Sequence, residues 1–73
     1  MPKPPRISGQ EAVKAFQRAG WEVARQRGSH VIMIKPGQAV TLSVPSHSEI
    51  AKGTLRTLIR SAGLSVSEFL SAL

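Results

Sequence analysis

The sequence predicts a small α+β domain in which one helix precedes three antiparallel strands and two helices follow them. Two helix-start motifs, three short strand-like runs and the turns between these runs indicate the order αβββαα. With 73 residues and no internal repeat, the whole chain, residues 1–73, is expected to form one domain. Because the three strands follow one another between helices, this order favours a three-stranded antiparallel sheet with helices on one face and solvent on the other.

The first helix is predicted by a capping box at its start and a glycine at its end. Ser8 and Glu11 have the spacing in which the serine hydroxyl accepts from the N–H three residues on, while the carboxylate reaches back to the serine N–H. The helix is expected from Gly9 to Ala19, with Phe16 on its buried side. Gly20 then supplies the residue type that a left-handed helix end prefers.

Three strands are predicted from alternating or β-branched runs separated by turn residues. The runs are Trp21 to Arg27, His30 to Lys35 and Ala39 to Val44. Gly28-Ser29 is a hairpin turn between the first two runs. Pro36-Gly37 fits a type II turn before the third, because proline fixes φ and glycine takes the positive φ. Strands joined by such tight turns form an antiparallel meander.

Two details of these strands follow from local chemistry. Strict alternation in the first strand places Arg25 and Arg27 on the same face as Trp21 and Val23. Pro45 is expected to stop the third strand, because proline has no N–H for the ladder.

The last part of the chain predicts a loop and two helices. The loop covers Pro45 to Lys52, and the second helix begins near Gly53-Thr54 and ends at Gly63. A second capping box at Ser65–Glu68 opens a short terminal helix. The second helix has an apolar face built from residues three and four positions apart: Leu55, Leu58, Ile59 and Ala62.

The charge of the chain indicates an anionic partner. Ten Lys and Arg against four Asp and Glu give a formal net charge of +6. Such a field attracts nucleic-acid phosphates, and it also suits an anionic membrane surface or an acidic protein. No apolar run approaches the roughly 20 residues that span a bilayer. Residues 1–6, which we expect to be flexible, lack the apolar run of a signal peptide. We therefore expect a cytoplasmic protein with no membrane partner.

Composition also argues against a metal or an organic cofactor. The chain has no cysteine, which excludes a disulfide framework and a thiolate zinc site. Its two histidines and four scattered carboxylates are too few for a dedicated metal cage. A domain of this size does not enclose a deep pocket for a small-molecule cofactor. Trp21, Phe16 and Phe69 are assigned to the core, which leaves no aromatic platform for stacking bases.

His30 is the first candidate for catalysis. It follows the tip Gly28-Ser29, with Arg25 and Arg27 before the tip and Lys35 at the end of the next strand. A histidine can take the proton of a 2′-hydroxyl or give one to the leaving 5′-oxygen. Neighbouring cations stabilise charge on the phosphorane, and glycine lets a phosphate approach the backbone. Taken alone, a hairpin histidine is more often a strand residue without a catalytic role.

Two further segments are candidate phosphate contacts. His47, in the loop after the third strand, is either a second general acid or base, a phosphate contact, or a loop residue that satisfies nearby backbone. Lys52-Gly53-Thr54 opens the second helix, where free N–H groups and the helix dipole attract phosphate. Arg56 extends that surface, although a solvated helix face is the default interpretation for it and for Arg60.

In order and spacing these motifs resemble the HicA (YcfA-like) family of toxins from toxin–antitoxin pairs. The resemblance covers the chain from about Ser8 to the C-terminus. No single motif is specific for the family. The specific signal is the ordered combination of the glycine-serine-histidine tip and the lysine-glycine-threonine helix start. The matching segments are Gly20-Trp21, Arg25 to His30, Val44-Pro45 with His47, Lys52 to Leu55, Ala62 to Leu64, and Glu68-Phe69.

The resemblance implies a fold like that of double-stranded-RNA-binding domains, whose topology the basic αβββα order also matches. It implies an mRNA-cleaving toxin that does not need the ribosome, with His30 as the catalytic residue. The implied partner is a HicB-type antitoxin that covers the histidine face, and an acidic partner suits the net charge of +6. Two alternatives stay open: a non-catalytic RNA-binding module, and a domain whose basic face only docks an acidic protein.

Overall fold

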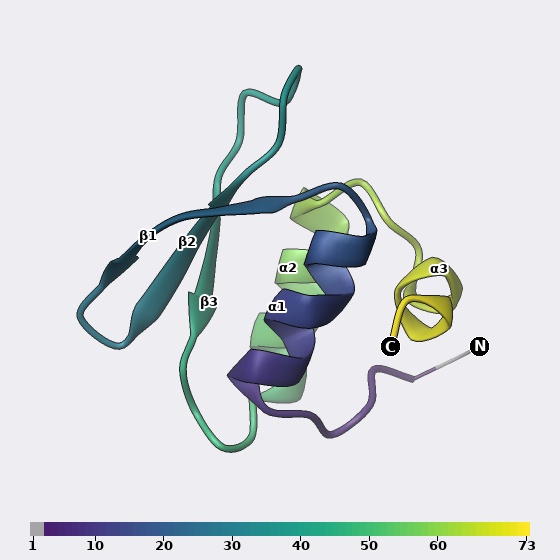
Figure 1. The fold of residues 1–73 in the computed structure, drawn as a ribbon. Helices are drawn as coiled ribbons and strands as arrows, with labels where there is room; N and C mark the ends of the chain where they lie inside the picture. Colours follow the sequence, from purple (N-terminus) through teal and green to yellow (C-terminus); the bar gives the residue numbers. More distant parts are fainter. Residues whose placement is uncertain (1–2) are drawn as a thin grey trace.

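The computed structural model describes residues 3–73 and shows an α+β domain. Figure 1 shows helices α1 and α2 on one side of a three-stranded sheet. The predicted fold class and element order are therefore confirmed. In the described part of the chain, no helix has the length and apolar character needed to cross a membrane. The elements are α1 (Gly9–Arg18), β1 (Glu22–Arg27), β2 (His30–Ile34), β3 (Leu42–Pro45), α2 (Lys52–Ser61) and α3 (Val66–Ser71).

The segment that precedes α1 packs against the domain. The flexibility expected for residues 1–6 falls partly on residues 1–2, which lie outside the described residues. Within the described remainder, Pro4 is buried. Ile7 belongs to the core, and its carbonyl accepts a hydrogen bond of 2.9 Å from the N–H of Ile50. This bond ties the start of the chain to the segment before α2.

The sheet is the predicted antiparallel meander, with β2 between β1 and β3. Met33 of β2 and Leu42 and Val44 of β3 are fully buried, so their face of the sheet is the one covered by the helices. Residues at the alternate positions point the opposite way. We call that side, turned away from the helices, the open face.

A β-bulge in β1 reverses the expected orientation of its two arginines. Val23 pairs with Met33, but Arg25 pairs with Ile32, so Ala24 is an extra residue. Beyond the bulge the alternation is shifted by one position, which turns both arginines to the open face while Val23 stays on the helix side. The prediction that the arginines share a face with Val23 is wrong, because it assumed an unbroken strand.

β3 also differs from the predicted strand at both ends. Its pairing with β2 begins at Met33 and Leu42, so residues 39–41 lie outside the ladder. At the other end Pro45 belongs to β3 as its last residue, opposite His30. An edge strand tolerates proline, because an N–H on its outer side needs no ladder partner.

The predicted aromatic residues lie in the core. Phe16 and Phe69 are fully buried, and Trp21 is nearly so. The ring centroids of Phe16 and Phe69 are 5.0 Å apart with the planes tilted by 50°, a contact that joins α1 to α3. The core is completed by apolar residues of the sheet and of α2: Met33, Leu42, Val44, Leu55, Leu58 and Ile59.

Both predicted capping boxes are present. Ser8 Oγ accepts from the Glu11 N–H at 3.2 Å, and Glu11 Oε1 accepts from the Ser8 N–H at 3.1 Å. Ser65 and Glu68 repeat the arrangement at α3. The pKa of the Glu68 carboxyl is lowered mainly by its hydrogen bond with the Ser65 backbone, and further by its hydrogen bond with the Ser65 side chain. α2 differs, because Ala51 stands at its N-cap and supplies no side-chain acceptor.

Gly9 is expected to be required for the junction between α1 and the loop after β3. Its N–H donates to the carbonyl of His47 at 2.9 Å, and a Cβ at this position would overlap the carbonyl oxygen of Pro45. Gly9→Ala is therefore expected to lower the free energy of unfolding by about 1–3 kcal/mol in urea denaturation. Gly53→Ala is the control, because a Cβ there meets open space. Equal stability of Gly9→Ala and the natural protein would contradict the close packing.

Candidate functional site

His30 lies on the open face, at the start of the central strand. In the register it stands between Arg27 of β1 and Pro45 of β3. Its side chain is exposed. The ring Nδ1 is 3.2 Å from the hydroxyl oxygen of Ser43, a hydrogen bond whose direction depends on the tautomer. The second ring nitrogen, Nε2, is thus left for a ligand.

The arginines of β1 share this face with His30. Arg27 is directly opposite His30, and Arg25 is opposite Ile32, one place further along the same face. Residues directly opposite one another have Cβ atoms about 4.5–5.5 Å apart, and diagonal neighbours are within reach of long side chains. The bulge at Ala24 is what puts both arginines on the same face of the sheet as the histidine.

The hairpin tip stands next to this group of residues. Gly28 has φ of 59° and open space around it, so the backbone there is accessible. The carbonyl of Ser29 accepts a hydrogen bond of 2.7 Å from the N–H of Ser46. This bond ties the tip to the loop that follows β3.

His47 lies on a different side of the sheet from His30. It borders a cavity of about 400 Å³ whose lining includes Gln26 and Val31. These two residues pair with each other, and Val31 also pairs with the buried Val44, so they point toward the helices. The structure therefore does not bring the two histidines together on one face.

The segment Lys52-Gly53-Thr54 forms the first turn of α2. All three residues are exposed, and the absence of a side-chain cap at Ala51 leaves the first N–H groups available for a ligand. In Figure 1 this turn and the β1–β2 tip lie in the lower half of the molecule, away from the β2–β3 loop. Arg56 lies further along α2, where it borders a groove of about 560 Å³ together with Lys3 and Arg60.

Lys35 is not brought to the group around His30. It follows the far end of β2, and its Nζ donates to the carbonyl of Ala19 at 3.1 Å. The side chain is half-buried and lies against Gly20. Lys35 therefore stabilises the C-terminal end of α1, because a cation there interacts favourably with the helix dipole.

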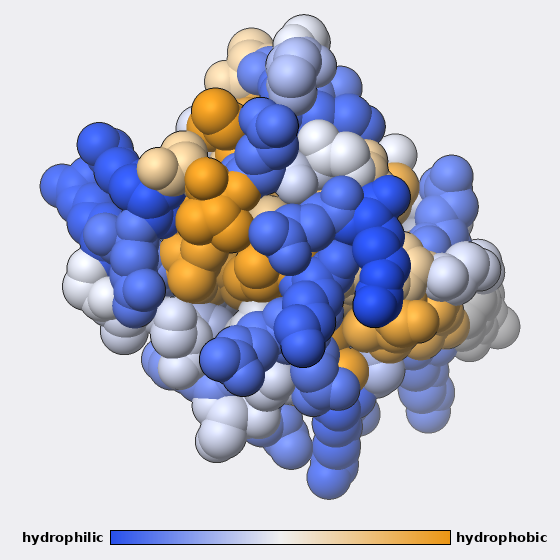
Figure 2. Space-filling model, viewed as in Figure 1, coloured by the Kyte–Doolittle hydropathy of each residue, from blue (hydrophilic) through white to orange (hydrophobic). Residues whose placement is uncertain are grey.

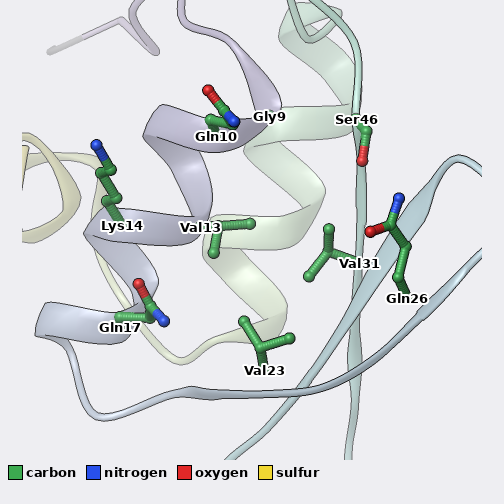
Figure 3. Close-up of a pocket in the computed structure, with 9 residues that line it drawn as sticks. All are labelled: Gly9, Gln10, Val13, Lys14, Gln17, Val23, Gln26, Val31 and Ser46. Carbon is green, nitrogen blue, oxygen red and sulfur yellow. The ribbon is translucent and has the colours of Figure 1, made fainter.

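Sequence reasoning missed Ser43 and a groove on the helix side. The groove, of about 310 Å³, lies between α1 and the β1–β2 hairpin and has an apolar floor of Val13, Val23 and Val31 (Figure 3). Figure 2 shows apolar side chains gathered there on the surface. Neither feature has a local signal in the sequence, because Ser43 meets His30 through strand register and the groove depends on the bulge.

The chemistry of the site rests on the histidine, the hydroxyl and the cations. Among residues 3–73, no three His, Asp or Glu residues are grouped closely enough to hold a metal ion. Two of the four carboxylates, Glu11 and Glu68, are engaged in capping boxes. The open face thus offers positive charge and one titratable ring to an anion.

One of two comparisons with known proteins gives a match. A family model described as HicA toxin of bacterial toxin–antitoxin matches residues 9–64, which is more than half of the chain. The match begins at the first residue of α1 and ends just after α2. A comparison with curated proteins found no significant match.

Proposed function

Because the chain belongs to the HicA toxin family of bacterial toxin–antitoxin systems, we propose that it is an endoribonuclease that cleaves mRNA without the ribosome. The observation that supports this most strongly is the grouping on the open face, where Arg27 stands opposite His30 and Arg25 follows on the same face. A general acid or base beside phosphate-binding cations is an arrangement that suits cleavage of a phosphodiester.

In the proposed reaction His30 Nε2 removes the proton of a 2′-hydroxyl, whose oxygen attacks the adjacent phosphorus. The bond from phosphorus to the 5′-oxygen breaks, the leaving oxygen takes up a proton from water, and Nε2 returns its own proton to the solvent. The products are a 2′,3′-cyclic phosphate and a 5′-hydroxyl. Arg25 and Arg27 stabilise the negative charge that builds up on the phosphorane. No metal ion or cofactor takes part in this scheme.

The remaining candidates bind the RNA backbone away from the reacting bond. Gly28 and Ser29 admit a phosphate at the hairpin tip, and the first turn of α2 (Lys52-Gly53-Thr54) offers N–H groups and a cation to another. Arg56 on α2 and His47 in the loop after β3 add to the basic surface outside the open face. An exposed site of this kind holds its substrate loosely, so we expect turnover that is slow for a nuclease.

The family implies an antitoxin partner, and we propose that this antitoxin is of the HicB type. An acidic protein that covers the open face would neutralise the arginines and block access to His30. Because mRNA is the proposed substrate, the site of action is the cytoplasm.

The test is cleavage of a labelled mRNA by the purified protein, with EDTA present and ribosomes absent. The proposal predicts shorter fragments that accumulate with time. Intact RNA that nevertheless shifts on a gel would overturn the catalytic proposal and leave a non-catalytic RNA-binding module.

Removal of the two β1 arginines is expected to weaken catalysis. A hydrogen bond to a charged group contributes about 1.5–3 kcal/mol, so the Arg25→Gln/Arg27→Gln double variant should lose about 10- to 100-fold or more in kcat/KM. The salt dependence of RNA binding should also become shallower, because fewer counterions are released. Arg18→Gln/Arg60→Gln removes the same charge from the helices and is the control. Equal losses in both double variants would show that only net charge matters.

A further inference from the structure

The side chain of Ser43 forms a hydrogen bond with the imidazole of His30. Its hydroxyl oxygen lies 3.2 Å from Nδ1 of the histidine. Ser43 lies on β3, opposite Ile32 of β2. Ser43 is therefore the diagonal neighbour of His30 on the open face. Both residues are exposed, so the hydrogen bond is not enforced by burial.

The other neighbours of His30 in the ladder cannot replace this contact. Arg27, directly opposite on β1, carries donors only, and Pro45, directly opposite on β3, has no polar side-chain atom. Arg25 is a second cation on the same face. A ring that must present a free Nε2 needs an acceptor for the hydrogen on Nδ1, and among these neighbours the Ser43 hydroxyl supplies it.

We propose that Ser43 is a positioning residue for His30, an inference that rests on the proposed ribonuclease function. Its hydroxyl accepts from the Nδ1–H and so selects the tautomer in which Nε2 carries the lone pair. This leaves Nε2 able to take the 2′-hydroxyl proton. The hydroxyl still accepts from Nδ1–H after Nε2 has been protonated, so the ring keeps its orientation after the proton transfer.

The kinetic test compares Ser43→Ala with the conservative Ser43→Thr and with Thr41→Ala. Thr41 is an exposed hydroxyl residue just before β3, so its replacement controls for loss of a hydroxyl close to Ser43 in the chain. Ser43→Ala is expected to lower kcat about tenfold with little change in KM, because the group positions the ring rather than the RNA. Ser43→Thr should restore most of the rate, and Thr41→Ala should match the natural protein.

The spectroscopic test does not depend on activity. The ¹⁵N shifts of the neutral ring of His30 report which nitrogen carries the hydrogen. The proposal predicts the Nδ1–H tautomer in the natural protein and in Ser43→Thr, with a shift toward Nε2–H in Ser43→Ala. A predominant Nε2–H form in the natural protein, or the same tautomer ratio in Ser43→Ala, would overturn it.

The two proposals fail in distinguishable ways. If the natural protein cleaves RNA and Ser43→Ala cleaves it at the same rate, only the role of Ser43 is overturned. If the natural protein does not cleave RNA at all, the ribonuclease function fails and the positioning role fails with it, whatever the tautomer.

Discussion

Replacing His30 with alanine is expected to lower the rate of RNA cleavage by about 10²–10⁴-fold, the usual contribution of a general acid or base. The variant loses the ring nitrogen that moves the proton, while the arginines and the first turn of α2 still bind phosphate. RNA affinity should therefore fall only modestly. Single-turnover cleavage of a labelled mRNA, with a gel-shift titration beside it, measures the two effects separately.

The fold of this variant should be unchanged, because His30 is exposed and contributes nothing to the core. Circular dichroism and thermal unfolding check this point. His47→Ala is the matched comparison, since it removes the other histidine from a different side of the sheet, and we expect a much smaller loss of rate. Cleavage that persists in folded His30→Ala protein would contradict the assignment of the catalytic residue.

Phe16→Ala is expected to destabilise the domain by about 3–5 kcal/mol. Phe16 is fully buried and its ring packs on that of Phe69, so truncation leaves a cavity where α1 meets α3. A chain of 73 residues has a total stability of roughly 4–11 kcal/mol, so the expected loss is a large fraction of the total.

Urea denaturation followed by tryptophan fluorescence measures this loss, because Trp21 belongs to the same core cluster. Phe16→Leu is the control, since a smaller loss of volume should cost less. An unchanged midpoint for Phe16→Ala would show that α1 is not held by this contact.

The parts of the fold that depend on local chemistry could be predicted from the sequence. Serine and glutamate three residues apart predicted both capping boxes, because each box closes within one helical turn. Gly28 and Gly37 both have positive φ, at 59° and 81°, which agrees with the two predicted turns. These features need no knowledge of distant residues.

The parts that depend on pairing between strands could not be predicted. The bulge at Ala24 carries no residue-type signal, and it decides which face Arg25 and Arg27 occupy. The same limit applies to Ser43, whose contact with His30 is set by the register of β2 and β3. The hairpin histidine and its nearby arginines could be singled out from the sequence, but the face that these arginines occupy and the contact with Ser43 could not.

The other candidate site residues also divide into those placed by local sequence and those placed by the tertiary structure. The free N-terminus of α2 could be predicted because it lies within one segment, Lys52-Gly53-Thr54. Lys35 is close to His30 in the sequence, but the two residues lie at opposite ends of β2. Lys35 instead contacts the C-terminal end of α1.

The chemical ends of the RNA products test the central claim most directly. A labelled mRNA is incubated in EDTA with the natural protein or with His30→Ala, and the new termini are identified. Attack by the 2′-hydroxyl predicts 2′,3′-cyclic phosphate and 5′-hydroxyl ends with the natural protein and none with the variant. Products with 5′-phosphate ends, or identical cleavage by both proteins, would contradict a histidine-driven transesterification on the open face.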